Sequence, residues 1–457
     1  MTDMKRIFSA AFAAVAFAAF ADVSLDGSWS FRFDEGKMLE AASGSDFTAA
    51  DTIPVPACYD MMPKWYMKRG TGLYRRTFTL DAPMKDAVLV VDGMGVRAKF
   101  EIDGKSLGVH PYPYARLEIP VGPLSALGCW CYQNLHWWEK DMKQIEKLGV
   151  VERQVTLPNG NVINYGELEG DGPALLLIHG QMVSWENYAS VMPELHENWH
   201  IYAIDVYGHG ESTHKEELYY LDVNGDDIIW FIENVIGEKT VVSGHSNGAL
   251  TAAYVAAYGG DMVKGVVLED PPVFSTQGED WENSFPYLDT YKPLHDYIST
   301  EQTECWEAYY LRHCYWGELF MKDSMPGIAD YAQQYSETHP GEEVKIFFMP
   351  SSAISAFHYL KNYDLLYGEH FYDLTWNNGI KHEQLLSDIE IPCVYLHAKE
   401  EKADNGVYLC AASKEQAERA VALIGDNCQL IETEDSNHDI HGAHTQVYLD
   451  AINSFLK

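Results

Sequence analysis

The sequence predicts an α/β fold for most of the chain, preceded by a small all-β segment. From about residue 148, apolar runs too short for globular helices alternate with helix-like segments. Such alternation predicts a parallel sheet covered by helices on both faces. Ligands of these sheets bind outside the carboxyl ends of the strands. The motifs described below lie at those ends.

The predicted elements follow one another in an order that such a sheet allows. A hairpin is expected over 150–162, where two β-like runs flank Pro-Asn-Gly. The remaining predicted strands are 174–178, 199–204, 240–243, 265–268, 393–396 and 429–431. Helices are predicted over 226–235, from the spacing of apolar residues, and over 249–257, from small residues.

The most informative motif is Gly-His-Ser-Asn-Gly at 244–248, between a predicted strand and a predicted helix. A Gly-x-Ser-x-Gly turn holds its serine in a strained, exposed conformation, and the glycines tolerate the crowding on either side. The helix N-terminus behind the serine favours developing negative charge. The motif therefore predicts a reactive serine, Ser246.

Together with three further motifs, this one makes residues 148–457 resemble the α/β-hydrolase superfamily. The other motifs are His179-Gly180, the loop 205–212 and Asn437-His438, each after a predicted strand. The resemblance implies an α/β-hydrolase fold whose helical cap is the long insertion at about 272–388. The insertion is dense in aromatic residues, which would exclude water and shape an apolar pocket.

The resemblance also implies roles for individual residues. Ser246 would be the nucleophile that forms an acyl-enzyme, and His438 the general base. The backbone N–H groups of Gln181 and Asn247 would form the oxyanion hole. His438 also has histidine neighbours at 441 and 444, and such a cluster could instead be a solvated loop or bind a metal ion.

The acid of the triad has three candidates. The superfamily's usual place is the loop after strand 393–396, which contains Asp404 and Glu401. Some members use a carboxylate after the preceding strand, where Asp270 lies. The order of preference is Asp404, Asp270, Glu401.

The first third of the chain differs in character. Residues 1–21 combine Lys5-Arg6, an apolar stretch and Ala19-Phe20-Ala21, the pattern of a secretory signal peptide. A secreted or periplasmic location follows, although the scattered cysteines of the hydrolase part are typical of cytoplasmic proteins. No other run is long enough to span a membrane after cleavage.

Residues 22–123 contain short β-like runs and resemble a truncated sugar-binding jelly-roll domain of family 2 glycoside hydrolases. The resemblance rests on Leu25–Trp29, Gly72–Phe78 and Ile102–His110. The catalytic barrel of those enzymes is absent, so glycosidase activity is not implied. Residues 124–147 form a junction, and either a natural fusion or a chimeric gene product would explain it.

Composition narrows the function further. The formal net charge of −36 argues against nucleic acid as a partner. The sequence has no dinucleotide fingerprint and no P-loop, so no cofactor is expected. The favoured function is a serine hydrolase acting on a small-molecule ester or acyl substrate, with a carbohydrate-linked ester as one candidate. The alternative is a carbohydrate-binding or scaffolding protein with an inactive hydrolase fold.

Overall fold

The computed structural model describes ten short stretches before residue 135 and most of the chain after residue 137. The early stretches are 5–9, 23–24, 27–35, 51–55, 70–79, 84–91, 98–102, 105–110, 117–124 and 127–134. The later part is 138–456 without 279–280, 321, 323–324, 345–358, 404 and 434–437. The chain divides into two compact units, residues 1–140 with 346–355 and residues 141–345 with 356–457.

The described stretches of the first unit are β-strands. One sheet has the strand order β2-β1-β6-β9 and the other β4-β3-β5-β10-β7-β8. The strands are β1 Lys5–Ser9, β2 Val23–Ser24, β3 Gly27–Glu35, β4 Asp51–Val55, β5 Gly70–Thr79, β6 Met84–Val91, β7 Ala98–Ile102, β8 Lys105–His110, β9 Leu117–Leu124 and β10 Leu127–Asn134. The jelly-roll resemblance, the signal peptide and the domain boundaries stay predictions, and most of residues 1–21 lie outside the described residues.

The second unit is built on a mixed eight-stranded sheet with the order β11-β12-β14-β13-β15-β16-β17-β18. The first two strands form the predicted hairpin, and from β14 onward neighbouring strands are parallel. The strands are β11 Val151–Thr156, β12 Val162–Leu168, β13 Ala174–Ile178, β14 His200–Ile204, β15 Thr240–His245, β16 Val263–Glu269, β17 Cys393–His397 and β18 Cys428–Glu432. The predicted α/β architecture is therefore confirmed for this unit.

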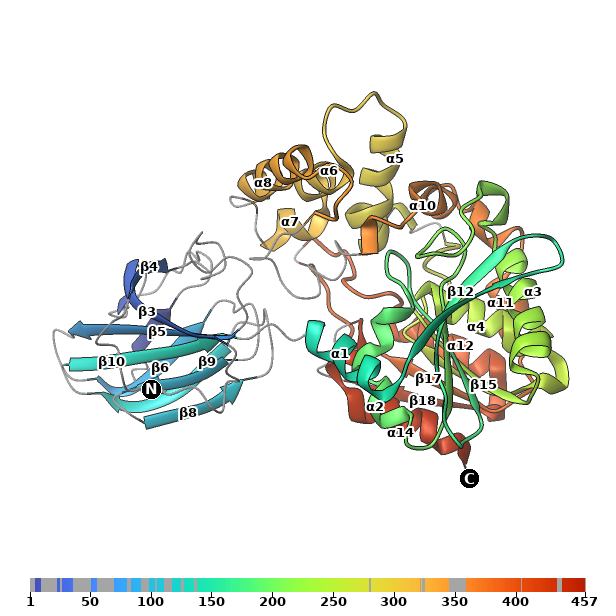
Figure 1. The fold of residues 1–457 in the computed structure, drawn as a ribbon, viewed down its shortest axis with the longest axis horizontal. Coiled ribbons are helices and arrows are strands. Elements are labelled where there is room, and N and C mark those ends of the chain that lie inside the picture. Colours follow the sequence, from blue (N-terminus) through green and yellow to red (C-terminus); the bar gives the residue numbers. More distant parts are fainter. Residues whose placement is uncertain are drawn as a thin grey trace. The chain divides into compact units, whose positions relative to one another are not determined.

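Helices cover both faces of this sheet (Figure 1). The principal ones are α1 Trp138–Leu148, α2 Met192–Leu195, α3 Leu221–Phe231, α4 Asn247–Tyr258, α12 Lys414–Ile424, α13 Ile440–Ala443 and α14 Thr445–Asn453. Short 3-10 or π segments accompany them, among them η2 Trp185–Ser190 and η4 Ile232–Ile236. Within the part of the chain that the structure describes, no helix combines the length and apolar character needed to cross a bilayer.

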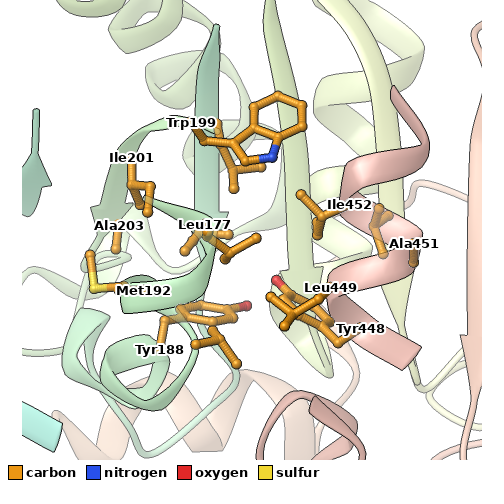
Figure 2. Close-up of a cluster of buried hydrophobic side chains, with 14 of the residues drawn as sticks. Leu177, Tyr188, Met192, Trp199, Ile201, Ala203, Tyr448, Leu449, Ala451 and Ile452 are labelled. Atoms are coloured by element: carbon orange, nitrogen blue, oxygen red, sulfur yellow. The ribbon is translucent and has the colours of Figure 1, made fainter. Parts of the chain in front are cut away.

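One face of the sheet packs against η2, α2 and α14 in a continuous apolar core. Tyr188 and Met192 meet Tyr448 and Ile452 over the sheet residue Leu177, as Figure 2 shows. All five side chains are inaccessible to solvent. Burying an aliphatic or aromatic side chain of this size stabilises a fold by about 1.5–3 kcal/mol. The core therefore holds rigid the strands whose carboxyl ends carry the predicted site.

The segment between β16 and β17, where a cap was predicted, is largely helical in its described part. Its elements are η6 Trp281–Asn283, η7 Tyr287–Tyr291, α5 Lys292–Ile298, α6 Trp306–His313, α7 Tyr315–Phe320, α8 Met325–Thr338, α10 Leu365–Tyr372, η8 Thr375–Asn377 and α11 His382–Ser387. Its aromatic rings pack largely on one another; Tyr291, for example, stacks on Phe371 with 5.3 Å between ring centroids. Much of its aromatic content is therefore its own core.

Candidate active site

Ser246 lies on a sharp turn between β15 and α4. Its backbone has φ 57° and ψ −124°, a conformation in which a non-glycine residue is strained. The Ser246 N–H donates to the carbonyl of Glu269 at 2.9 Å, which ties the turn to the neighbouring strand β16. The sequence therefore places this serine at the carboxyl edge of the sheet, as predicted.

The two glycines of the motif are required by close backbone contacts. A Cβ atom on Gly244 would lie 2.1 Å from the carbonyl oxygen of Gly248. A Cβ atom on Gly248 would lie 2.2 Å from the carbonyl oxygen of His179. Larger residues would push the turn away from the sheet, so the crowding expected from the sequence is present.

His438 faces the carboxylate of Asp270. The ring Nδ1 of His438 lies 2.7 Å from Asp270 Oδ2, a hydrogen bond in which the ring N–H donates. The side chain of Asp270 is fully buried, while that of His438 is 44% exposed. Asp270 also has an unusual φ of 42°, and its Oδ1 accepts the backbone N–H of Ala398 at 3.1 Å. An oriented, accessible histidine on a fixed carboxylate is the arrangement that a general base needs.

The charges of this pair reinforce each other. Burial raises the pKa of Asp270, but contacts with His397 and His438 and the N–H of Ala398 outweigh burial and lower it to about 2. Burial lowers the pKa of His438, but Asp270, Glu269 and Asp439 together raise it above its ordinary value. Asp270 is therefore ionised at any physiological pH, and it favours the protonated form of His438.

Of the three acids predicted from sequence, the structure describes Asp270 and Glu401. Asp404, placed first, lies outside the described residues. Glu401 is exposed and lies 3.4 Å from Lys399 Nζ. Asp270, placed second, is the carboxylate at hydrogen-bond distance from His438. Asp270 directly follows β16, and its other carboxylate oxygen is held by the backbone N–H of Ala398 after β17.

Gln181 and Asn247 lie on either side of the serine turn. A Cβ atom on Gly180 would lie 3.1 Å from Ser246 Cβ, so the segment leading to Gln181 runs beside the serine. Asn247 is the first residue of α4, where backbone N–H groups have no partner within the helix. Both positions suit backbone donors for an oxyanion.

The side chains of Gln181 and Asn247 are hydrogen-bonded to tyrosines of the segment between β16 and β17. The Gln181 amide bonds the hydroxyls of Tyr291 and Tyr363, the latter at 2.5 Å. The Asn247 amide donates to the hydroxyl of Tyr367 at 2.9 Å. Burial raises the pKa of all three tyrosines, so their hydroxyls stay protonated. This segment therefore brings polar hydroxyl groups to the site, in addition to the apolar surface expected from its composition.

A second histidine–carboxylate group lies beside the first, and the sequence analysis did not identify it. Glu269, Asp439 and His441 bring one donor atom each to within 4.8 Å of one another, a spacing that could hold a metal ion. Both ring nitrogens of His441 already face carboxylates, however, at 3.0 and 3.1 Å. The group therefore has the geometry of an ion-paired histidine. The sequence signal for this group was the pair of consecutive carboxylates at 269 and 270, together with the two histidines at 438 and 441.

Comparison with known proteins agrees with this architecture. Residues 173–293 match the family model of the alpha/beta hydrolase fold. A 2-(acetamidomethylene)succinate hydrolase of Mesorhizobium japonicum is 31% identical over 113 residues, 24% of this chain and 41% of that protein. A serine hydrolase-like protein of Homo sapiens is 25% identical over 142 residues, 30% of this chain and 69% of that protein. The solved structure of an esterase from Rhodococcus sp. ECU1013 is 20% identical with a TM-score of 0.45, covering 67% of this chain and 98% of that one.

Residues 173–293 match the family model, and the mixed eight-stranded sheet with its covering helices is an α/β-hydrolase fold. Taken with hydrolases among the sequence relatives, they support an enzyme of the hydrolase type. The chain spans 41% and 69% of the lengths of the two curated relatives named above, so its reaction and substrate are matters for proposal.

Proposed function

We propose that the chain is a serine hydrolase that cleaves a carboxylic ester or a related acyl bond through an acyl-enzyme on Ser246. The observation that carries this proposal is the 2.7 Å contact between His438 and Asp270 at the same sheet edge as the strained serine turn. A serine hydrolase-like relative supports the choice of nucleophile.

In the proposed reaction, His438 removes the proton from the Ser246 hydroxyl as its oxygen attacks the acyl carbon. Asp270 accepts the other ring N–H and stabilises the imidazolium that forms. The N–H groups of Gln181 and Asn247 stabilise the oxyanion, and each such donor contributes roughly 100- to 1000-fold in rate. His438 then protonates the leaving alcohol, and a water molecule repeats the sequence to release the acid.

The substrate class follows from what surrounds the serine. Next to the two proposed oxyanion positions, the neutral hydroxyls of Tyr363 and Tyr367 accept from the amides of Gln181 and Asn247, and that of Tyr291 donates to Gln181. A small-molecule ester with further oxygen atoms near its acyl group would find hydrogen-bond partners there, which a plain hydrocarbon chain would not use. A carbohydrate-linked ester is one such substrate.

Hydrolysis of short-chain p-nitrophenyl esters tests the reaction. The wild-type chain should turn them over, and Ser246→Ala should reduce the rate to background while the circular dichroism spectrum is unchanged. Ser387→Ala is the matched control, because Ser387 is an exposed serine on α11 whose hydroxyl only caps the carbonyl of Glu383. A folded Ser246→Ala chain with wild-type turnover would remove the proposal.

Two finer proposals concern the N-terminal part and rest on its sequence motifs. Residues 1–21 direct export, and residues 22–123 bind sugar. The first predicts a mature chain starting at Asp22 when it is expressed with an export system, as read by N-terminal sequencing. The second predicts retardation of the full chain on a polysaccharide gel. Unprocessed, unretarded protein would contradict both.

A further inference from the structure

A second carboxylate–histidine pair, Glu269 with His441, lies directly beside the proposed catalytic pair. Glu269 immediately precedes Asp270, and His441 follows His438 by three residues. His441 Nδ1 lies 3.0 Å from Glu269 Oε2, and the two side chains are 1% and 0% exposed. No step of the proposed reaction uses this pair, so its burial needs another explanation.

The pair is part of a set of contacts that fixes the backbone on which His438 lies. The backbone N–H of His441 donates to Glu269 Oε1 at 2.7 Å. The ring Nε2–H of His245 donates to the carbonyl of His438 at 3.0 Å. Residues 438–441 are therefore tied at both ends to the carboxyl ends of β15 and β16. A buried carboxylate is costly without partners, so Glu269 holds these donors firmly.

The charges of the group act on His438 as well. Burial lowers the pKa of His441, but Asp439 and Glu269 outweigh it and raise it to about 9, so His441 is a cation at neutral pH. Burial lowers the pKa of His245 to about 4, which keeps that ring neutral. The His245 ring lies between the other two, with centroids 4.6 Å from His438 and 5.4 Å from His441.

The remaining groups around the pair are neutral. Asn187 and Tyr188 of η2 and Tyr448 of α14 contact the His441 ring, and none of them carries a charge at neutral pH. Three carboxylates, those of Asp270, Glu269 and Asp439, raise the pKa of His438. The cation of the group is His441, three residues further along the chain, and both rings neighbour that of His245.

We propose that Glu269 and His441 are positioning residues of the hydrolase, which hold His438 against the sheet while the His441 cation offsets the nearby carboxylates. The cation thereby limits how strongly these carboxylates favour the protonated form of His438. The proposal rests on the proposed function, since it concerns the base of that reaction. It goes beyond that function because neither side chain takes part in a step of the proposed reaction, and Glu269 contacts Ser246 only through its backbone carbonyl.

The test is the pH dependence of kcat/KM for a p-nitrophenyl ester. The acid limb of this profile is the pH range in which activity falls because His438 becomes protonated. His441→Gln removes a positive charge near His438, so the acid limb should move to higher pH by about one unit. Glu269→Gln removes a negative charge while Asp439 still holds the His441 proton, so the limb should move to lower pH. A purely structural role would lower activity in both variants without opposite displacements of the limb.

Two further variants keep the test decisive. The double change Glu269→Gln with His441→Gln removes both charges and should return the limb close to its wild-type position, even where a single variant is too unstable to assay. His200→Gln is the matched control, because His200 is also paired with a glutamate, Glu167 at 3.0 Å, but lies at the start of β14. Its limb should not move.

The outcomes separate this proposal from the one on which it rests. If a fluorophosphonate never labels Ser246 in the wild-type chain, both proposals are wrong. If every variant is labelled and all limbs coincide, only the positioning proposal is wrong. Loss of activity on chelation with EDTA and its recovery with zinc would also overturn it, because Glu269, Asp439 and His441 would then be metal ligands.

Discussion

Glu269 and Asp270 are consecutive in the chain, and each is fully buried and lies within 3.0 Å of one histidine ring nitrogen, yet their surroundings differ. His438, the partner of Asp270, has a side chain that is 44% exposed. His441, the partner of Glu269, is 1% exposed and has a second carboxylate, Asp439, on its other ring nitrogen. One imidazole can exchange protons with a bound substrate, and the other is a fixed cation.

The difference teaches that a short histidine–carboxylate distance does not by itself identify a catalytic base. The distances are 2.7 Å and 3.0 Å, close to each other, and both pairs lie at the end of β16. Accessibility and the number of carboxylates distinguish them. The accessible histidine contacts one carboxylate, whereas two carboxylates hold the proton of the buried one.

The largest expected effect is on catalysis at the exposed pair. Asp270→Asn should lower kcat by about 10⁴-fold, because an amide no longer selects the productive tautomer of His438. Glu269→Gln should lower kcat at its own pH optimum by only about tenfold, since it acts through a positioning contact. Steady-state kinetics on a p-nitrophenyl ester measure both. Equal losses would erase the distinction between the two pairs.

The next effect is on the stability of the fold, which the change at Glu269 should reduce more than the change at the half-buried Glu167. Glu269→Gln should reduce the free energy of unfolding by about 3–5 kcal/mol, because it leaves a buried cation with a single carboxylate. Glu167→Gln, which breaks the half-buried pair with His200, should cost about 1 kcal/mol or less. Urea unfolding followed by tryptophan fluorescence compares the two. Similar losses would mean that the Glu269 pair is energetically ordinary.

A smaller effect is the pH dependence of stability. The pKa of His441 is raised to about 9, so its contribution is fully present below about pH 6.5 and is lost as the pH rises through 9. The pKa of Asp270 is lowered to about 2, so its contribution is present above about pH 4 and is lost as the pH falls through 2. Thermal melts should therefore fall between pH 6.5 and 9 in the wild type.

His441→Gln should remove most of that alkaline slope and leave the acid side unchanged. Gln446→Ala on the exposed face of α14 serves as control, with the slope kept. A slope that survives in His441→Gln would mean that another group releases the proton.

The smallest effect concerns the buried tyrosines that contact the side chains of Gln181 and Asn247. Tyr363→Phe removes one hydrogen bond to Gln181 and should lower kcat/KM about three- to tenfold, mostly through KM. Tyr297→Phe is the control, because its hydroxyl donates to the carbonyl of Glu304 in the connection between α5 and α6. An unchanged kcat/KM in Tyr363→Phe would show that this hydroxyl does not contribute to the site.

The sheet could be predicted well because local signals coincide with its elements. Residues 174–178 form exactly the predicted strand, since five apolar residues end at a glycine-containing turn. The helix predicted over 226–235 begins earlier, at Leu221, and its last turn widens into a π-helix that ends at Gly237. Such end effects depend on packing and capping, which apolar spacing does not encode.

The site could be predicted only in part, because its decisive contacts are remote in sequence. The serine turn is a local motif and was found. The acid partner of His438 lies 168 residues away, and only the fold brings the two together. The pair of Glu269 and His441, 172 residues apart, was missed for the same reason. The sequence named His441 only as a neighbour of His438, in a cluster for which a solvated loop or a metal site was the alternative explanation.

The most direct test of the account is peptide mass mapping after treatment with a fluorophosphonate. The account predicts one adduct on wild-type protein, on the peptide that contains Ser246, formed faster as the pH rises through the titration of His438. Ser246→Ala should carry no adduct, and Asp270→Asn should label far more slowly. An adduct on another serine, or equal labelling of wild type and Asp270→Asn, would contradict the assignment of this site.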